Sequence, residues 1–242
     1  MKANRFTIVM PTRNAEMEVA RSLYSIWAQT HPNWKIVIID DASDDKTLDE
    51  IERFQTKFRL PEDRLKIISN STQQYALPNI LTGIEEADES DIICHIDGDD
   101  WLCDMDALSL INMRYEKTPS IQALWTSQRW GFSHYNISGA LPQDADPYTH
   151  PWVSSHMKTF RASTFRDISD SNFRNEDGSY FQRVADQALY LPVLHKAEGN
   201  WFHEPFTAYH YSIEVRKDIF QNQDAKFQKQ EADFLRIRGF LS

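Results

Sequence analysis

Glycine is scarce in this chain of 242 residues, which has only seven, and the first of them is Gly83. Loops that cradle a phosphate with backbone amides are usually built from several glycines, because other residues resist the backbone angles required. The absence of glycine from the first 82 residues therefore argues against folds whose nucleotide site begins with a glycine-rich loop.

Cysteine and long apolar runs are also scarce. The two cysteines, Cys94 and Cys103, have no Cys or His partner at metal-ligand spacing, so we expect reduced thiols rather than a disulfide or zinc site. No segment approaches the ~18 consecutive apolar residues that a transmembrane helix needs. The N-terminus lacks a secretory or transit signal. We therefore expect a cytoplasmic protein with no transmembrane segment.

The net charge of −10 comes from one stretch of the chain. Between Glu85 and Asp106 there are ten acidic residues and no Lys or Arg, whereas the remainder carries 26 acidic and 26 basic residues. Such a segment is either a solvated surface or a cation site. The hydrophobic content of 41% is ordinary for a globular protein, and the length suits one α/β domain.

Strand-like and helix-like patterns alternate through the first half of the chain. Short apolar runs predict strands, and apolar residues at helical spacing predict helices between them. The expected strands are 6–10, 35–39, 65–68, 92–96 and 123–126. The expected helices are 19–27, 48–58, 80–87 and 105–115, and Asp44 or Asp45 can cap the second. This order predicts a mostly parallel sheet flanked by helices.

The second half is less regular. Residues 130–150 are predicted to be a loop, 163–168 a short helix, and 201–211 two short strand-like runs broken at Pro205. A helix over 186–196 should kink or restart at Pro192, and 224–240 forms an amphipathic C-terminal helix. We expect one domain over 1–242, in which 1–129 forms the ligand-binding half and 130–242 an irregular half.

Polar clusters follow three of the predicted strands, at 12–14, 40–45 and 97–100. In parallel α/β sheets ligands bind beyond the carboxyl ends of the strands, so these clusters predict one site. Asp97 and Asp99, with Asp100 beside them, can present carboxylates to a hard divalent cation such as Mn²⁺ or Mg²⁺. The alternative is a solvated turn that caps the next helix.

The other two strand ends carry groups suited to a nucleoside. Asp40 or Asp41 could accept a hydrogen bond from a nucleobase or ribose, although this acidic segment could equally cap a helix. Pro11 ends the first strand, and Arg13 could stack on a base or contact a phosphate. An ordinary exposed turn explains Arg13 equally well.

The second half offers a general base and several weaker site residues. Asp186 precedes an apolar helix and could deprotonate an acceptor hydroxyl, but the helix dipole alone also favours an acid there. Asp177 is a rival for this role. His210 is a candidate additional metal ligand, and Trp152 and His156 could line an acceptor pocket.

The segments "IVMPTRN", "IIDDASDDKT", "HIDGDDW" and "ADQALYLPVLHKAEG", in this order, resemble the family 2 glycosyltransferases. The resemblance covers about residues 6–211. It implies a GT-A fold, a nucleoside diphosphate sugar donor, an acceptor hydroxyl and inversion of anomeric configuration. It also implies that Asp41, Pro11 and Arg13 contact the nucleoside. Asp97 would approach the ribose or sugar, Asp99 would hold Mn²⁺ or Mg²⁺ on the diphosphate, and Asp186 would be the base.

Two positions depart from the family pattern. Many members have an aromatic residue where Arg13 stands. The base is usually the second acid of a Glu-Asp pair, but Ala185 precedes Asp186, and such a pair occurs at Glu176–Asp177. We expect a UDP-linked donor and a glycan, a lipid-linked sugar or a modified nucleobase as acceptor.

Four other functions are alternatives for this sequence. A sugar-nucleotide-forming nucleotidyltransferase lacks its glycine-rich loop here, and a receiver-type signalling domain would be about half as long. A sugar-binding protein without activity would keep the fold alone. A phage-type enzyme acting on hydroxymethylated DNA would need a basic surface, which the net charge opposes, although four residues could form a local patch. These are Lys158, Arg161, Arg166 and Arg174.

Overall fold

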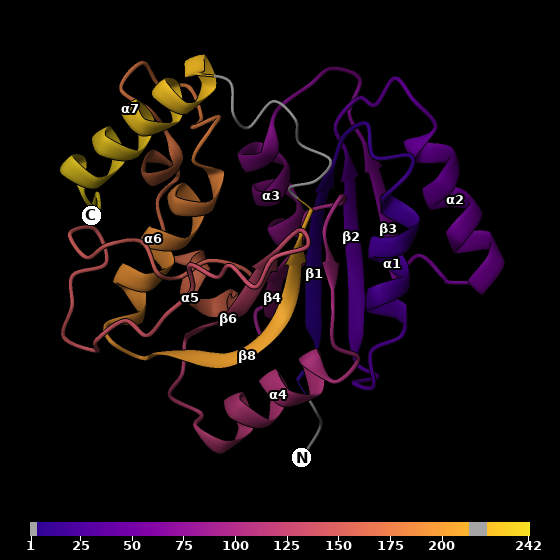
Figure 1. Cartoon of the computed structure of the whole chain (residues 1–242), viewed down its shortest axis with the longest axis horizontal. Helices are drawn as coiled ribbons and strands as arrows, with labels where there is room; N and C mark the ends of the chain where they lie inside the picture. Colours follow the sequence, from indigo (N-terminus) through magenta and orange to yellow (C-terminus); the bar gives the residue numbers. More distant parts are fainter. Residues whose placement is uncertain (1–3, 213–221) are drawn as a thin grey trace.

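The computed structural model describes residues 4–212 and 222–242. The chain folds into a curled sheet with helices on both faces (Figure 1). Strands β1 to β8 occupy Phe6–Thr12, Trp34–Asp40, Leu65–Ser69, Ile92–His95, Trp101–Leu102, Ala123–Trp130, Lys158–Arg161 and Trp201–Tyr211. Helices α1 to α7 occupy Val19–Trp27, Thr47–Phe58, Ala76–Glu85, Ala107–Lys117, Ala162–Arg166, Ala185–Ala197 and Asn222–Arg238, and a 3₁₀ helix covers Asp170–Phe173. Within the described ranges, no helix is long and apolar enough to cross a membrane.

The sheet is parallel on one side and mixed on the other. Its strand order is β3-β2-β1-β4-β7-β6-β8-β5. The first four strands are parallel, β7 runs antiparallel to both β4 and β6, and β8 is parallel to β6. The α/β fold class is thus as predicted, and the carboxyl ends of β1, β2 and β4 lie together at one edge.

Alternating side chains of the central strands feed two separate apolar cores. In β1, Ile8 and Met10 pack with α1, α2 and α4, whereas Val9 between them packs with α3 and α6. All seven residues of β1 are buried. A strand covered on both faces reads as a continuous apolar run, which explains why the sequence predicted it so readily.

The strands of the sheet differ from the predictions in three respects. The short strands β5 and β7 were not predicted, and the expected break at Pro205 is wrong because β8 is one continuous strand. The register between β6 and β8 shifts around Thr126 and Ser127, opposite Glu204 and Thr207. This irregularity accommodates Pro205, which cannot donate a ladder hydrogen bond.

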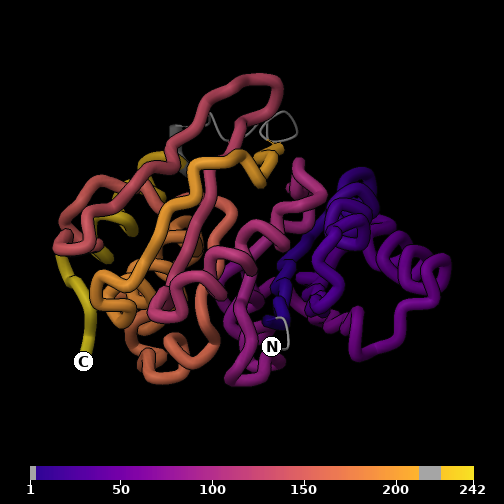
Figure 2. The backbone as a smooth tube through the Cα atoms, turned by 90° about the horizontal axis from the view of Figure 1, so that it is seen from below, coloured from indigo at the N-terminus to yellow at the C-terminus, as the bar shows by residue number. Residues whose placement is uncertain are grey.

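The helices of the second half also differ in detail. Helix α6 continues through Pro192 without a break or restart. Helix α7 packs through Leu235, but its apolar face is narrower than predicted, since Phe227 and Ile237 are 43% and 87% exposed. Between β6 and β7, residues 131–157 contain no helix or strand, as predicted for 130–150, and Figure 2 shows them projecting as a long loop.

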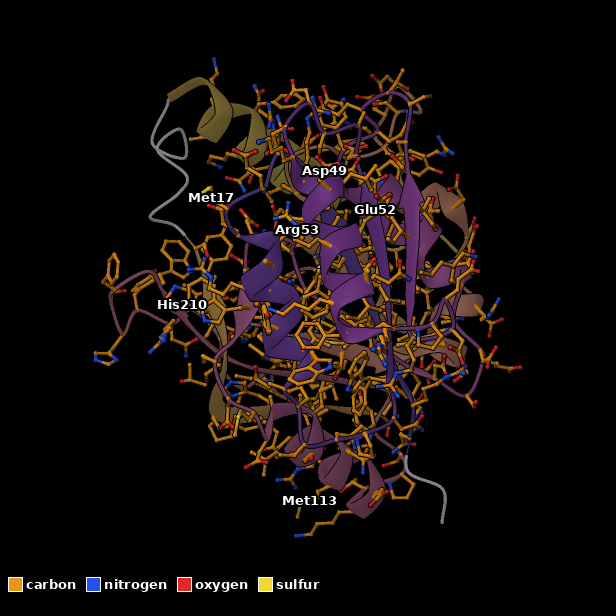
Figure 3. All side chains as sticks on the ribbon, turned by 90° about the vertical axis from the view of Figure 1, so that its right-hand side faces the viewer. Met17, Asp49, Glu52, Arg53, Met113 and His210 are labelled. Carbon is orange, nitrogen blue, oxygen red and sulfur yellow. The ribbon has the colours of Figure 1, made fainter. Side chains whose placement is uncertain are left out.

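The acidic segment is not one surface, because it lies at both ends of β4. At the start of the strand, Asp91 is buried and accepts hydrogen bonds from Arg5 and Thr7. At the other end lie Asp97 and Asp99. At the start of β4, Asp88 and Asp91 pair with Arg5 and stabilise the fold. The carboxylates beyond the other end of β4 are therefore the ones that can contact a ligand. Other charged groups, such as Asp49, Glu52 and Arg53, follow one face of α2 (Figure 3).

Candidate functional site

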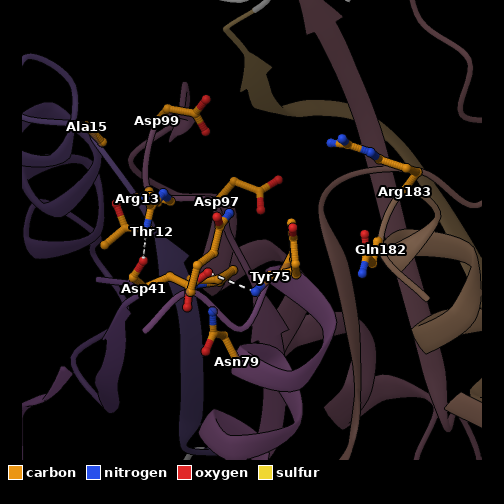
Figure 4. Close-up of a pocket in the computed structure, with 14 residues that line it drawn as sticks. Thr12, Arg13, Ala15, Asp41, Tyr75, Asn79, Asp97, Asp99, Gln182 and Arg183 are labelled. Carbon is orange, nitrogen blue, oxygen red and sulfur yellow. Dashed lines mark hydrogen bonds between the residues drawn. The ribbon is translucent and has the colours of Figure 1, made fainter. Parts of the chain in front are cut away.

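The three polar strand ends converge on one cavity of about 260 Å³ (Figure 4). It is lined by Pro11, Thr12, Arg13, Ala15, Asp41, Gln73, Tyr75, Ala76, Asn79, Asp97, Gly98, Asp99, Gln182 and Arg183. The predicted residues Pro11, Arg13, Asp41, Asp97 and Asp99 are therefore brought together. In Figure 4, Gln182 and Arg183 face the strand-end residues from the opposite wall.

Gly98 sets the position of the acidic loop. Its N–H donates to the carbonyl oxygen of Pro11 at 3.0 Å, and a Cβ atom at this residue would lie 2.3 Å from Thr12 Oγ1. Only glycine allows such an approach. The loop after β4 can thus lie directly on the end of β1, and this brings Asp97 and Asp99 to the cavity.

Asp41 is the best-supported carboxylate of the cavity. Its Oδ1 accepts hydrogen bonds from the Gln74 backbone N–H at 2.7 Å and Asn70 Nδ2 at 2.9 Å, and its Oδ2 accepts one from the Tyr75 N–H at 2.9 Å. Burial alone would raise the pKa of Asp41, but the amide groups around it, including Asn79, hold it below the ordinary value. An ionised, fixed acceptor therefore faces the cavity.

The main contacts of Arg13 are with the loop after β2. Its guanidinium donates to the backbone carbonyl oxygens of Asp41 and Ala42, the latter at 2.6 Å. These bonds fix the end of β2 beside the end of β1. Arg13 still lines the cavity, so its positive charge remains close to any anionic ligand there.

Tyr75 and Arg183 are cavity residues that sequence reasoning missed. Tyr75 has φ +70°, a conformation unfavourable for a non-glycine residue, and its N–H is held by Asp41. Its ring contributes an aromatic wall that Arg13 does not. No regular spacing marks either residue, although strain at a cavity wall is itself a sign of a constrained binding role.

The acids after β4 have different surroundings. Asp97 and Asp99 line the cavity, whereas Asp100 does not, and its buried carboxylate accepts hydrogen bonds from Tyr209 Oη at 2.8 Å and the Ser212 N–H at 2.7 Å. The negative charge of Asp99 also acts on Glu18, the residue before α1. The pKa of Glu18 is raised, first by burial and then by the charge of Asp99. The carboxylate oxygens of Asp99 at the cavity wall are hard donors of the kind that Mn²⁺ or Mg²⁺ prefers. Asp100 has a structural environment instead.

Asp186 lies in the first turn of α6, surrounded by basic groups. Lys158 Nζ donates to its Oδ1 at 2.8 Å, and His156 Nε2 lies 3.1 Å from its Oδ2. His95 Nδ1 lies 3.9 Å from Oδ1. Desolvation would raise the pKa of Asp186, but its interactions with His156 and Lys158 hold it well below the ordinary value. Asp186 is thus an ionised carboxylate with a side chain 37% exposed.

Helix α7 holds the loop that leads into α6. The carboxylate of Glu231, which is 3% exposed, accepts the backbone N–H groups of Gln182 and Arg183 at 3.1 and 2.7 Å. These are the two residues that line the far wall of the cavity. The C-terminal helix therefore holds the far wall of the cavity in place, a role that its sequence did not reveal.

The remaining predicted residues lie elsewhere. Asp177 lies in an exposed turn, where its carboxylate accepts the Ser179 N–H and hydroxyl, and these bonds lower its pKa. His210 is buried, with its ring stacked 3.6 Å from that of Trp101 and Nδ1 accepting from Arg129. Trp152 packs against the core beside α6. His156 alone among the acceptor-side predictions contacts Asp186.

The structure removes one residue, Lys158, from the predicted basic patch and gives the other three intramolecular contacts. Lys158 is fully buried on Asp186, and Arg161 donates to the carbonyl oxygens of Pro119 and Ile121. Arg166 donates to Ala87 O, and Arg174 pairs with Asp170. Buried Lys158 cannot contribute to a cationic surface of the kind that binding to a DNA backbone relies on, whereas Arg166 remains exposed.

Residues 7–169 match the family model described as glycosyl transferase family 2, and the chain belongs to this family. The match ends before α6, so it does not include Asp186. Among curated relatives, the Escherichia coli UDP-Glc:alpha-D-GlcNAc-diphosphoundecaprenol beta-1,3-glucosyltransferase WfgD is 30% identical over 97 residues, which are 40% of this chain and 36% of WfgD. This chain spans between 17% and 36% of the lengths of the curated relatives that it matches.

Two solved structures have the same fold. S. aureus TarS 1–349 in complex with UDP-GlcNAc aligns with a TM-score of 0.65 at 18% identity, covering 86% of this chain and 58% of that chain. The mannosyltransferase PcManGT from Pyrobaculum calidifontis, in complex with GDP-Man and Mn²⁺, aligns with a TM-score of 0.66 at 17% identity. That alignment covers 100% of this chain and 66% of PcManGT. The GT-A fold that the sequence predicted is confirmed.

Proposed function

We propose that the protein is an inverting glycosyltransferase that moves a sugar from a nucleoside diphosphate sugar, UDP-linked, to an acceptor hydroxyl. The observation that carries this proposal is the convergence of Asp41, Asp97 and Asp99 on one cavity at the carboxyl ends of parallel strands. Family membership supports it, as do fold neighbours whose titles name UDP-GlcNAc and GDP-Man.

The nucleoside occupies the part of the cavity between Asp41 and Tyr75. The carboxylate of Asp41 lines the cavity and is held there by the N–H groups of Gln74 and Tyr75, so it is a fixed acceptor for a donor group of the base or ribose. Pro11 and Arg13 contact the nucleoside from the end of β1. Tyr75 offers its ring as a stacking surface.

The diphosphate lies beside Asp99, with Asp97 directed to the ribose or sugar. Asp99 is the residue that would hold Mn²⁺ or Mg²⁺, and the chemistry that such a cation supplies when bound is stabilisation of the charge on the departing diphosphate. Arg183, on the opposite wall, is a second positive group for the same phosphates.

Asp186 is the general base. In the transfer, the acceptor oxygen bonds to the anomeric carbon from the side opposite the diphosphate, the bond from that carbon to the diphosphate oxygen breaks, and the nucleoside diphosphate leaves with the electron pair. Asp186 receives the proton of the acceptor hydroxyl. The side chain of Asp186 is 37% exposed and can reach an acceptor, whereas Asp177 caps its own exposed turn. His156 is the acceptor-side residue that touches this base.

The alternatives have less support. A receiver-type module is not supported by the family match or by the fold neighbours. An enzyme for hydroxymethylated DNA would have to bind a DNA backbone without Lys158, which is buried, and with a net charge of −10. A binding protein without activity would still bind the donor, and it is distinguished by the absence of turnover.

The experiment that tests the proposal is calorimetric titration of UDP, GDP, TDP and CDP into the purified protein, each with and without Mn²⁺. We expect UDP to bind, and to bind more tightly with Mn²⁺. Failure of every diphosphate to bind a folded sample would contradict the proposed function. Preferential binding of GDP would leave the proposed glycosyltransferase activity in place and change the proposed donor from a UDP-linked to a GDP-linked sugar.

A further inference from the structure

A buried basic cluster lies behind Asp186, formed by His95, His156 and Lys158. His95 and Lys158 are register partners in the antiparallel pairing of β4 with β7, and His156 precedes β7 by two residues. Their exposed fractions are 1%, 2% and 0%. Lysine is almost never fully buried unless it is paired, so this position requires an explanation.

We propose that Lys158 is a positioning residue that fixes the orientation of the Asp186 carboxylate. The inference rests on the proposed function, in which Asp186 is the general base. Lys158 acts on both carboxylate oxygens, on one directly and on the other through His156.

The direct contact is the hydrogen bond from Lys158 Nζ to Asp186 Oδ1 at 2.8 Å. The second contact follows from the tautomer of His156. Lys158 Nζ also lies 3.3 Å from His156 Nδ1, and an ammonium group can only donate, so Nδ1 must be the acceptor. The single proton of neutral His156 then lies on Nε2, which donates to Asp186 Oδ2 at 3.1 Å.

The charge state of His156 agrees with this arrangement. Burial lowers the pKa of His156, and the ammonium group of Lys158 lowers it further, against the opposing effect of Asp186. A neutral imidazole donating through Nε2 is therefore the form that the cluster favours. During transfer Asp186 takes the proton of the acceptor, while Lys158 and His156 keep theirs.

A metal ion is not the occupant that this cluster favours. One ligand atom from each of His95, His156 and Asp186 lies within 4.8 Å of the others, which is close enough for a shared ion. However, the ammonium group of Lys158 already contacts both His156 and Asp186. It provides the positive charge that a cation would provide, and a second one would be repelled.

The pairing of Lys158 with Asp186 does not make Asp186 a stronger base. The charges around Asp186 lower its pKa, and a lower pKa makes a carboxylate a weaker base. The pair must therefore act by holding the carboxylate ionised and aligned with the acceptor. Misplacement of a reacting group by about 1 Å can cost roughly 100-fold in rate, so orientation is a sufficient reason to bury a lysine.

The test compares Lys158→Met, Lys158→Arg and Asp186→Asn, with Lys66→Met as the matched control, because Lys66 also pairs with an acid but on β3. The reaction followed is release of UDP from UDP-glucose with Mn²⁺ and water as acceptor. We expect Lys158→Met to lower kcat roughly 10- to 100-fold with an unchanged KM, and Lys158→Arg to restore part of the loss. Lys66→Met should match the unaltered protein.

Two further readouts separate positioning from a general loss of structure. Adding Lys158→Met to Asp186→Asn should cause no further loss of kcat, since the residue to be positioned is gone. Carbon-13 NMR of the Asp carboxyl groups should show Asp186, identified by its loss in Asp186→Asn, titrating at higher pH in Lys158→Met. The charged and titratable groups that face Asp186 are Lys158, His156 and His95, and of these only Lys158 is substituted in this comparison.

The outcomes separate the role of Asp186 as the base from the role of Lys158 as a positioning residue. Full turnover in Asp186→Asn would overturn the assignment of the base and with it this part of the proposed function. Loss of turnover in Asp186→Asn, with a normal kcat in Lys158→Met, would overturn the positioning role alone. An unchanged Asp186 titration in Lys158→Met would also overturn it, and this result needs no turnover of any donor.

Discussion

Gly98 and Thr12 lie so close together that a methyl group on Gly98 would meet Thr12 Oγ1 at 2.3 Å and Thr12 Cβ at 2.5 Å. The acidic loop after β4 rests on this contact. We expect Gly98→Ala to destabilise the protein by about 1–3 kcal/mol through overpacking and to weaken Mn²⁺-dependent UDP binding, because the loop must move. Urea unfolding and calorimetry would measure the two effects.

Gly139→Ala is the matched control for this substitution. The nearest atoms to an added methyl group at Gly139 lie 3.9 Å away, and its backbone does not require glycine. Its unfolding and UDP binding should be nearly unchanged. Equal effects of the two substitutions would mean that the contact with Thr12 has no special role.

Asp99 is expected to be the residue through which a divalent cation strengthens donor binding. Asp99→Ala should abolish the gain in UDP affinity on adding Mn²⁺, and leave weak metal-independent binding in place. Asp63→Asn, which neutralises an exposed acid outside the cavity, should keep the full gain. A normal response to Mn²⁺ in Asp99→Ala would move the metal site elsewhere.

Asp186→Asn should leave UDP affinity intact and lower the rate of sugar transfer by at least ~100-fold, the minimum expected for loss of a general base. Asp177→Asn should have no effect, because that carboxylate caps an exposed turn. Initial rates and calorimetry on the same samples separate the two quantities. The reverse ranking of the two variants would assign the base to Asp177.

Tyr75 is expected to provide the aromatic surface for the nucleobase. Tyr75→Ala should weaken UDP binding about 3- to 10-fold, the effect of one ring-stacking contact of roughly 0.5–1.5 kcal/mol. Tyr75→Phe keeps the ring and should bind normally. If Tyr75→Phe were as weak as Tyr75→Ala, the hydroxyl group and not the ring would be the important contact.

The strand ends of the first half could be predicted because buried parallel strands leave a clear apolar signal that stops at a polar cluster. Asp41, Asp97 and Asp99 were found in this way. Lys158 and His95 were not, because β7 is a four-residue strand whose basic residue resembles surface sequence. The partner of Lys158 is 28 positions away, and no local pattern records such a pairing. The one available sign was a histidine at the end of an otherwise apolar strand.

The stability of the protein should fall as the pH is lowered from 7 towards 5. The pKa of His156 is lowered in the folded state, so the unfolded chain binds a proton first, and stability is lost as the pH falls through the unfolded pKa of about 6.5. His156→Gln should reduce this slope by up to about 1.4 kcal/mol per pH unit.

Urea unfolding at several pH values would measure the effect of His156. His203 should contribute in the same direction, since burial also lowers its pKa. Asp186 contributes in a separate window, because its depressed pKa gives stability that is fully present above about pH 4 and lost only at more acidic values.

The pairing of β4 with β7 sets His95 opposite Lys158, one residue from each half of the chain. The two halves therefore do not behave as interchangeable modules during recombination. A graft of residues 130–242 onto a related donor-binding half would bring Lys158 to face whatever side chain the recipient strand carries at the position of His95. Exchange of acceptor halves among relatives should succeed most often when that single residue is transferred with them.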